Sequence, residues 1–419
     1  MTFYYYTIRK PQYEHTHDPE VRHLCTLNLT NDLYPMPTAH QYFLDTFGRK
    51  PSHVSHAPGR INLIGEHTDY NDGLVMPGAI DRYVTMYIAA NDSSLLRVHA
   101  TDLKESAEWK LHDADKSEQG WVNHLKGIIS QCVAQGHDIR GIDIVISSTV
   151  PVGSGMSSSS ALECAMILAI NAVNHLELDP WKMIHMLHRS NHEFLGVHGG
   201  IMDQTASLLG QLDSLLLLDC RSLESEYIKA DFAPYEMVVI NTNVQHDNAS
   251  GQYNQRPAEC ASALSLLQVS HPHVKSLRDA SLDMVSELRT HGHDLLANRV
   301  QYVIEENQRV RDARRAIAER DYGALGQLLY RSHGGLQELY EVSCPELDVL
   351  VSLSQQEIDV AGARMMGAGH GGCTINLIHR DYKEEVILRI CESYKATTGI
   401  SATPYYLRLS RGAWVEMVS

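Results

Sequence analysis

The chain has 419 residues, of which 43% are hydrophobic and 21% charged, so it is long enough for more than one core and too apolar for disorder. Its formal net charge of −16 argues against nucleic acid or an anionic membrane as the main partner, because both reward a positive surface. The eight cysteines are scattered without a C-x-x-C pair, and the chain shows neither a signal peptide nor an apolar run of membrane-spanning length. These features favour a reducing, cytoplasmic compartment.

The expected elements follow one another without a strict βαβ repeat. Residues 1–35 show little periodicity, and we expect an N-terminal appendage there. After it, the patterns predict a helix within 37–50, strands between 74 and 100, a strand over 141–151, helices from 158 and over 181–196, strands at 214–220 and 237–243, helices over most of 256–340, and a glycine-rich turn at 367–372. This mixture favours an α+β fold over a doubly wound parallel sheet.

Residues 57–73, APGRINLIGEHTDYNDG, combine a short apolar run with a dense polar cluster. The run 61–64 is expected to anchor the segment in a core, so that Arg60, Glu66, His67 and Asp69 lie close together. Polar groups beside a buried anchor are what a small hydroxylated ligand needs. The segment therefore predicts a binding site.

A loop rich in glycine and serine, PVGSGMSSSS over 151–160, precedes an expected helix. Glycines let the backbone approach a ligand, and serines at a helix start add hydroxyl and N–H donors where the helix dipole is positive. The loop is therefore suited to a phosphate chain, although it lacks the lysine of a Walker A sequence. The alternative interpretation is helix capping, for which one serine is enough.

Asp203 follows two apolar residues in the segment GGIMDQ, so we expect a partly buried carboxylate. Beside a positive group such as Arg60, it could act as a base or orient a substrate hydroxyl. The alternative is that Asp203 caps the helix that follows.

A glycine-rich segment and a row of histidines each suggest a specific ligand site, but a simpler structural interpretation is favoured for both. Residues 367–372 match G-x-G-x-x-G, but a strand pattern follows, so a turn that closes over a ligand is expected and a dinucleotide site is not. His185, His188 and His192 share one helix face, which could bind zinc. In a chain with 24 histidines, a solvated helix face is the favoured interpretation.

Taken together, these motifs resemble the GHMP family of small-molecule kinases and, within it, the galactokinases. Residues 59–73 are similar to the galactokinase signature, 150–163 to the nucleotide loop and 362–378 to the third, glycine-rich motif, and the resemblance spans about 37–411. It implies a two-domain GHMP kinase fold with the active site between the halves. We expect a ribosomal protein S5 domain 2-like N-terminal domain over 36–215 and a ferredoxin-like C-terminal domain over 216–419.

The resemblance also implies ATP-dependent phosphorylation of galactose at its anomeric hydroxyl, with Asp203 as the catalytic aspartate and Arg60 stabilising the reaction. Sugar contacts are implied for Glu66, His67, Thr68, Asp69, Gly200 and Tyr253. Nucleotide contacts are implied for Gly153, Ser154, Gly155, Met156, Ser157, Ser158 and Ser159, with Ser159 also a Mg²⁺ ligand. ATP and Mg²⁺ are thus the expected cofactors, sugar and ATP the expected partners, and the oligomeric state is left open.

One departure concerns the metal. Galactokinases usually carry a glutamate as second Mg²⁺ ligand twelve residues before the catalytic aspartate, and here that position is Asn191. Because a neutral amide binds Mg²⁺ more weakly than a carboxylate, we expect a raised Mg²⁺ requirement. Glu193 is expected to face elsewhere on the helix. A kinase for a related sugar, N-acetylgalactosamine or galacturonate, and a weakly active galactose sensor remain alternatives.

Overall fold

The computed structural model describes residues 38–113, 115–245 and 249–418, and for residues 245 and 249–253 it describes the backbone alone. All of the described helices and strands belong to one compact unit, Ala39–Ser419. The predicted appendage, residues 1–35, lies outside the described residues.

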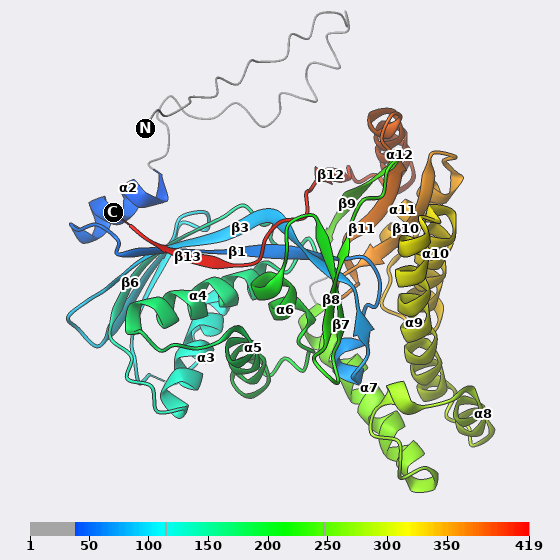
Figure 1. Ribbon diagram of the computed structural model, residues 1–419, viewed down its shortest axis with the longest axis horizontal. Helices are drawn as coiled ribbons and strands as arrows, with labels where there is room; N and C mark the ends of the chain where they lie inside the picture. The colour runs from blue at the N-terminus through cyan, green and yellow to red at the C-terminus, as the bar shows by residue number, and fades with distance from the viewer. Residues whose placement is uncertain (1–37, 114, 246–248, 419) are drawn as a thin grey trace, which may run out of the picture. The chain divides into compact units, whose positions relative to one another are not determined.

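The first part of the chain builds a six-stranded sheet in the order β13-β1-β3-β6-β4-β5. Its strands are β1 (His53–Asn62), β3 (Pro77–Ala90), β4 (Leu95–Ala100), β5 (Glu105–Lys110), β6 (Ile142–Ser148) and β13 (Trp414–Met417). Neighbours are antiparallel except for the parallel pair β4–β6. Strand β13, from the end of the chain, lies along β1 (Figure 1), so the last residues complete a sheet that begins near residue 53.

Helices cover one face of this sheet. They are α3 (Gly120–Ala134), α4 (Ser158–Asn174), α5 (Pro180–Arg189) and α6 (Met202–Leu209), while α2 (Ala39–Phe47) lies near β6. Helix α4 packs against β1 and β3, and ten of its residues are buried. The sequence predicted one helix over 181–196, but α5 gives way to a π-helical turn, Ser190–Leu195, which ends at Gly196 in the left-handed conformation. Apolar periodicity does not reveal such a change of pitch.

The second half carries two antiparallel sheets and longer helices. The four-stranded sheet has the order β10-β11-β9-β12, from β9 (Tyr235–Gln245), β10 (Val360–Met366), β11 (Gly371–His379) and β12 (Thr403–Tyr406). The three-stranded sheet contains β2 (Leu74–Val75), β7 (Ser214–Asp219) and β8 (Ser225–Lys229). The helices are α7 (Ala249–Ser270), α8 (Leu282–Thr290), α9 (Asp294–Glu319), α10 (Tyr322–Glu338), α11 (Pro345–Gln356) and α12 (Lys383–Thr398).

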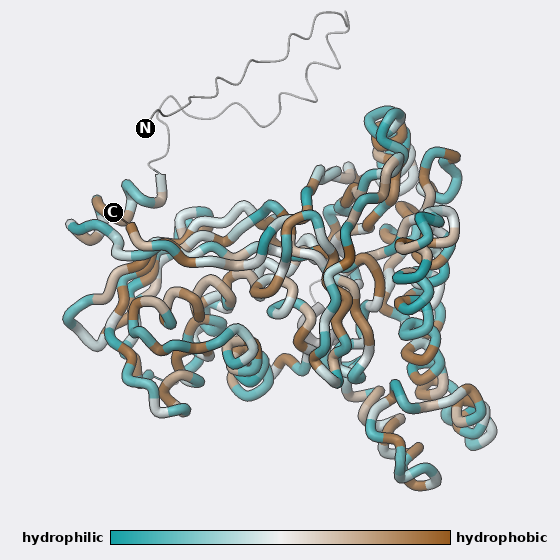
Figure 2. Tube along the Cα trace, viewed as in Figure 1, coloured by the Kyte–Doolittle hydropathy of each residue, from teal (hydrophilic) through white to brown (hydrophobic). Residues whose placement is uncertain are grey.

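Helices α9 and α10 lie side by side (Figure 1), and their traces mix hydrophilic and hydrophobic residues (Figure 2), as amphipathic helices do. The α+β fold class is confirmed. The largest core runs from the six-stranded sheet to residues of α9 and β11 such as Val310 and Ile375. The division at 215/216 therefore stays a prediction.

The described cysteines are all free thiols. Within the described part of the chain, no helix is both long enough and apolar enough to cross a membrane.

Helix α10 approaches β10 closely through glycine. A Cβ atom built on Gly326 would lie 1.7 Å from the backbone oxygen of Ala361, and one on Gly362 would lie 2.3 Å from the Cα of Gly326. Neither contact is possible without moving the helix away from the strand, so this packing requires glycine on both elements.

We therefore expect Gly326→Ala to lower the free energy of unfolding by about 1–3 kcal/mol or more, measured by urea denaturation. The matched control is Gly334→Ala in the same helix, where a Cβ meets nothing within 4 Å. The control should leave stability unchanged or raise it slightly, since alanine favours helix. Equal stability of the two variants would contradict the close packing.

Candidate active site

A cavity of about 400 Å³ lies where the three sequence motifs meet. Its walls come from the first motif and the serine-rich loop, from the start of α6 and from the turn after β10. The predicted site residues that line it are Arg60, Glu66, His67, Asp69, Gly153, Gly155, Ser157, Ser158, Ser159, Gly200 and Asp203. Segments separated by more than 300 positions thus share one cavity.

Arg60 joins three of these segments. From β1 its Nε donates to Oδ1 of Asp203 at 2.7 Å, and its Nη2 donates to Oδ2 at 2.9 Å. Its Nη1 donates to the backbone oxygen of Gly155, in the serine-rich loop. Arg60 is only 4% exposed, whereas the Asp203 side chain is 28% exposed. The paired arginine is therefore held rigidly in the wall, and its carboxylate partner remains accessible from the cavity.

The capping alternative for Asp203 is wrong. The residue at the cap of α6 is Ile201, and Asp203 lies inside the first turn. Its carboxylate instead accepts hydrogen bonds from Arg60 and from the Ser157 hydroxyl.

The serine-rich loop is shaped by positive backbone angles rather than by side-chain caps. Ser157, at the cap of α4, has φ 58° and makes no side-chain capping bond. Gly155 has φ +77°, and a Cβ there would lie 3.0 Å from the backbone oxygen of Met366. The loop thereby packs against the turn after β10 and leaves the hydroxyls of Ser158 and Ser159 on the cavity wall, at the positive end of α4.

Two predicted residues of this loop do not line the cavity. The Ser154 hydroxyl donates to the backbone oxygen of Pro151, and the side chain is fully buried. Met156 is fully buried in the core, and its backbone oxygen accepts the N–H of Arg60. The structure gives no support for a nucleotide contact by either side chain, because both face the protein interior.

The turn at 367–370 connects the antiparallel strands β10 and β11. The absence of a helix after this turn agrees with the sequence, which argued against a dinucleotide site. Gly367 and Ala368 line the cavity. The glycine-rich motif thus closes one side of the cavity, as expected.

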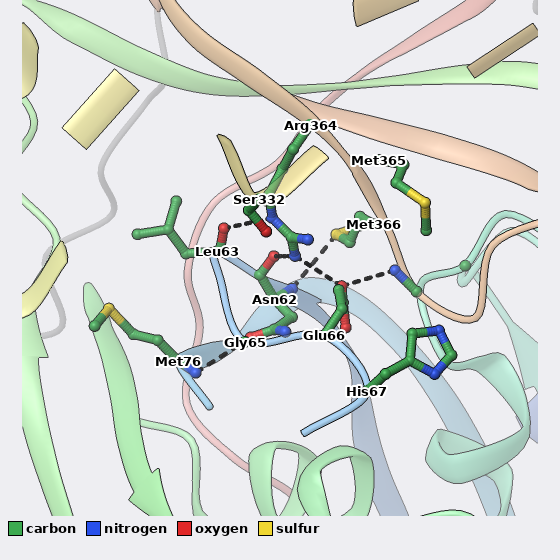
Figure 3. Close-up of polar contacts among 12 residues, drawn as sticks. Asn62, Leu63, Gly65, Glu66, His67, Met76, Ser332, Arg364, Met365 and Met366 are labelled. Atoms are coloured by element: carbon green, nitrogen blue, oxygen red, sulfur yellow. Dashed lines mark hydrogen bonds and ion pairs between the residues drawn. The ribbon is translucent and has the colours of Figure 1, made fainter. Parts of the chain in front are cut away.

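The loop after β1 is buried although it is irregular, and distant residues satisfy its backbone. Arg364 of β10 is fully buried and donates to the backbone oxygens of Asn62 and Leu63 at 2.9 and 2.8 Å (Figure 3). From α9, Glu306 accepts the N–H of Gly65 at 2.9 Å. These bonds fix the path of the loop, since a buried backbone group without a partner is costly.

Glu66 connects the first motif with the third. Its Oε1 accepts from Arg364 Nη2 at 2.8 Å and from the backbone N–H of Gly367 at 2.8 Å (Figure 3). The neighbouring His67 bonds Tyr70 through Nδ1 at 2.7 Å and the backbone oxygen of Ala368 through Nε2 at 3.2 Å. Burial lowers the pKa of His67 to about 3, so the ring is neutral at physiological pH.

Asp69 and Gly200 are in direct contact. A Cβ on Gly200 would lie 2.3 Å from the Asp69 carboxyl group, so only glycine fits there. Burial and the charge of Asp203 raise the pKa of Asp69 to about 7, while a hydrogen bond from the backbone N–H of Met202 opposes this rise. A carboxylate in this state gains from hydroxyl donors supplied by a ligand.

The remaining predicted sugar residues have different outcomes. The Thr68 hydroxyl donates to the backbone oxygens of Gly65 and Leu74 at 2.9 and 2.8 Å, and the residue is fully buried outside the cavity wall. The structure therefore assigns its side chain to the loop's internal bonding and does not support a sugar contact. The side chain of Tyr253 lies outside the described residues.

His188 of α5 and His192 of the π-helical turn have a structural role that the sequence did not predict. The Nε2 atoms of His188 and His192 lie 3.2 and 2.8 Å from the backbone oxygen of Gly199. Their rings therefore hold the segment that leads to Gly200 and Asp203. The described residues contain no group of three or more His, Cys, Asp or Glu side chains suited to hold a metal ion.

The sequence analysis missed Glu163, His124 and Gln204, which also line the cavity. Glu163 could have been found, because it follows Ser159 by one helical turn and so lies on the same face of α4. Asn191 lines the cavity as well, and Glu193 instead accepts from Gln131 of α3 at 2.7 Å. The expectation that Glu193 faces elsewhere is confirmed.

The oxygen groups on the wall fit a hard divalent cation. Ser159 offers a hydroxyl, Asn191 an amide, and Glu163 and Asp203 carboxylates, and Mg²⁺ prefers such ligands together with substrate phosphates.

Fold and site together define a GHMP kinase. The family model described as "GHMP kinases N terminal domain" matches residues 123–211, and the one described as "GHMP kinases C terminal" matches residues 313–396. A crystal structure of mevalonate kinase shares the fold, with a TM-score of 0.58 at 17% identity over 85% of this chain and 99% of that one.

The first motif indicates a particular group within the GHMP kinases. The "Galactokinase galactose-binding signature" matches residues 41–90. The chain is 36% identical over 374 residues to the galactokinase of Roseiflexus sp. (strain RS-1), covering 88% of this chain and 94% of the relative. It is 37% identical over 389 residues to that of Haemophilus influenzae (strain ATCC 51907 / DSM 11121 / KW20 / Rd), covering 91% and 99%.

A crystal structure of Lactococcus lactis galactokinase complexed with galactose has a TM-score of 0.86 at 30% identity, covering 90% of this chain and 98% of that one. The chain belongs to the galactokinase family.

We expect Gly200→Ala to lower kcat/KM for the sugar about a hundredfold, since a displacement of about 1 Å at a positioned group can cost that much. The added methyl would push the Asp69 carboxyl group out of place. Gly120→Ala is the control, because a Cβ there meets nothing within 4 Å. Near-normal kinetics for Gly200→Ala would contradict the contact with Asp69.

The raised pKa of Asp69 predicts a pH dependence of sugar binding. Since the pKa of about 7 in the folded protein exceeds the usual value of 3.8 for an aspartate, ionising Asp69 costs folding stability as pH rises from about 4 to about 7. Sugar hydroxyls that donate to the carboxylate offset this cost, so affinity should rise between pH 6 and pH 8, with proton release below pH 7.

Titration calorimetry in buffers of different ionisation enthalpy measures both effects. Asp69→Asn should bind sugar weakly and without pH dependence over this range, while the exposed Asp138→Asn should behave as wild type. A pH-dependent affinity that persists in Asp69→Asn would assign the titration to another group.

Proposed function

We propose that this protein transfers the γ-phosphoryl group of ATP to the anomeric hydroxyl of galactose, giving galactose 1-phosphate and ADP. The observation that carries the proposal is the single cavity in which Arg60 and Asp203 lie between a sugar-type polar cluster and a phosphate-type loop. Membership of the galactokinase family supports galactose over related sugars. The cytoplasmic location expected from the sequence stays a prediction.

Asp203 is proposed as the group that receives the hydroxyl. The sugar oxygen attacks the γ-phosphorus, the bond from that phosphorus to the β–γ bridging oxygen breaks, and the hydroxyl proton is directed to Asp203. Two N–H groups of Arg60 and the Ser157 hydroxyl hold the carboxylate in position. Because phosphoryl transfer depends mainly on positioning and charge, a carboxylate fixed in this way is suited to the task.

Arg60 is proposed to supply fixed positive charge next to the reacting atoms. A guanidinium does not lose its proton under physiological conditions, and this one is buried, so its charge acts in a medium of low dielectric constant. Its bond to Gly155 also ties the phosphate loop to Asp203. The Arg60 side chain thus fixes the position of the phosphate loop relative to the Asp203 carboxylate.

Sugar recognition is proposed to rest on Asp69, with Glu66, His67 and Gly200 shaping the pocket. The Glu66 Oε1 and both His67 nitrogens already have protein partners, so these residues hold the wall more than they offer free groups. The Ser158 and Ser159 hydroxyls, together with the N-terminus of α4, are proposed to receive the phosphates. Mg²⁺ would neutralise phosphate charge when bound with ATP.

Asp203→Asn tests the proposal in a coupled assay of ADP release. With galactose as substrate, we expect turnover to fall about 10²–10⁴-fold with little change in galactose affinity, because the amide keeps the shape but cannot take the proton. The control is Asp283→Asn, which changes an exposed acidic residue in the first turn of α8. If Asp203→Asn turned over galactose at the wild-type rate, Asp203 could not be the group that takes the hydroxyl proton.

A sugar panel in the same assay tests the substrate. Galactose should give the highest kcat/KM, ahead of N-acetylgalactosamine and galacturonate. A preference for either of these would redirect the assignment to a related sugar kinase, and ligand binding without ADP release from any sugar would indicate a sensor.

A further inference from the structure

A buried carboxylate in the cavity wall has no assigned task. Glu163, in α4, is 1% exposed and lines the cavity next to the serine-rich loop. Its Oε1 lies 2.7 Å from Nδ1 of His124, and its Oε2 accepts from Asn191 at 3.1 Å and from Gln204 at 3.3 Å. Among the described residues, its hydrogen-bond partners therefore include neither lysine nor arginine.

The contacts of Glu163 give it hydrogen bonds, but among the described residues its one ion-pair partner is His124, which is charged only when protonated. A carboxylate removed from water needs a partner of opposite charge or several hydrogen bonds. Here it also stands beside a loop proposed to hold phosphates, so carboxylate and phosphate would repel each other. A divalent cation between them would remove the repulsion and bind both, whereas a purely structural carboxylate would weaken nucleotide binding.

A second observation points to the same place. Gln204 is 4% exposed and lines the cavity, and its Oε1 has no hydrogen-bond partner among the described residues, although its Nε2 donates to Glu163. A buried acceptor without a donor calls for a ligand that brings one. A water molecule in the coordination shell of a cation is such a donor.

Helix geometry places a further ligand nearby. Ser159 and Glu163 are separated by one turn of α4, so both project from the same face of the helix, and both line the cavity. The Asn191 amide turns its N–H group toward Glu163, which leaves its oxygen as a neutral ligand atom.

We propose that Glu163 provides the carboxylate that binds the divalent cation of the nucleotide complex, with the Ser159 hydroxyl one turn before it and Asn191 as a neutral neighbour. This assignment rests on the proposed use of ATP. This assignment also explains Asn191. Because Glu163 carries the negative charge, the amide of Asn191 can donate a hydrogen bond to it, whereas a carboxylate at position 191 would repel Glu163. The metal requirement then stays ordinary rather than raised.

The test measures nucleotide binding without turnover. ADP is titrated into the sugar-free protein with excess Mg²⁺ and again with a chelator, and bound Mn²⁺ is followed by electron paramagnetic resonance in the presence of ADP. In Glu163→Gln, we expect the gain in ADP affinity caused by Mg²⁺ to shrink about tenfold or more. The metal-free affinity should stay the same or rise, because the variant lacks the charge that repels phosphate. The Mn²⁺ signal of the ternary complex should weaken in parallel.

Two controls separate metal binding from structure. Glu193→Gln removes a carboxylate of the neighbouring π-helical turn that contacts Gln131 instead of the cavity, and it should behave as wild type. The double variant Glu163→Gln/Asn191→Glu moves the carboxylate from position 163 to position 191. It should regain most of the increase in ADP affinity that Mg²⁺ causes. Glu163→Asp, which keeps the charge but withdraws the oxygens, serves if the glutamine variant does not fold, and it too should lose Mg²⁺ dependence.

The proposal is overturned if Glu163→Gln or Glu163→Asp keeps the wild-type Mg²⁺ effect. It is also overturned if these variants lose metal-free and Mg²⁺-supported affinity equally, because that result assigns Glu163 to holding Asn191 and Gln204. Wild-type protein that binds no ADP would overturn the proposed function itself, which distinguishes the two failures.

Discussion

The loop that follows β1 runs through the interior in an irregular path, and this constraint shapes the rest of the site. Buried N–H and C=O groups need partners, and outside regular structure they must find them far along the chain. Here Glu306 accepts from Gly65, Asn307 accepts from Leu74, and Tyr302 donates to Glu66, all from helix α9. The first motif therefore adopts its shape only when the second half of the chain is folded against it.

The same requirement links the sugar side to the phosphate side. Arg364 binds the backbone of the first motif and the Glu66 carboxylate, and Glu66 in turn accepts the N–H of Gly367. The glycine turn that begins at Gly367 packs against Gly155 of the serine-rich loop. A substrate that orders one of these segments thus acts on atoms in contact with the other.

The cavity carboxylates differ in what balances their charge. Asp203 has a bidentate arginine and a serine hydroxyl, which hold its carboxylate in position for the proposed contact with the reacting hydroxyl. Asp69 accepts hydrogen bonds from the backbone of Met202 and Tyr70 and has a raised pKa, so donors from a ligand would stabilise its charged form. Glu163 has His124 and two amides, and a cation would complete its surroundings. Similar side chains thus take separate tasks because their neighbours differ.

The sequence by itself determined the family, the α+β class and half of the residues that line the cavity, because glycine, serine and charged residues in fixed order carry local chemistry. Tertiary structure decided which of the motif residues face the cavity. Thr68, Ser154 and Met156 lie within the motifs but point into the protein. The hydroxyls of Thr68 and Ser154 donate to backbone oxygens, and Met156 is buried in the core. Glu163 and Gln204 have no distinctive local pattern, and only packing shows that both Gln204 and Asn191 donate to Glu163. Contacts between distant segments depend on packing, which local patterns do not specify.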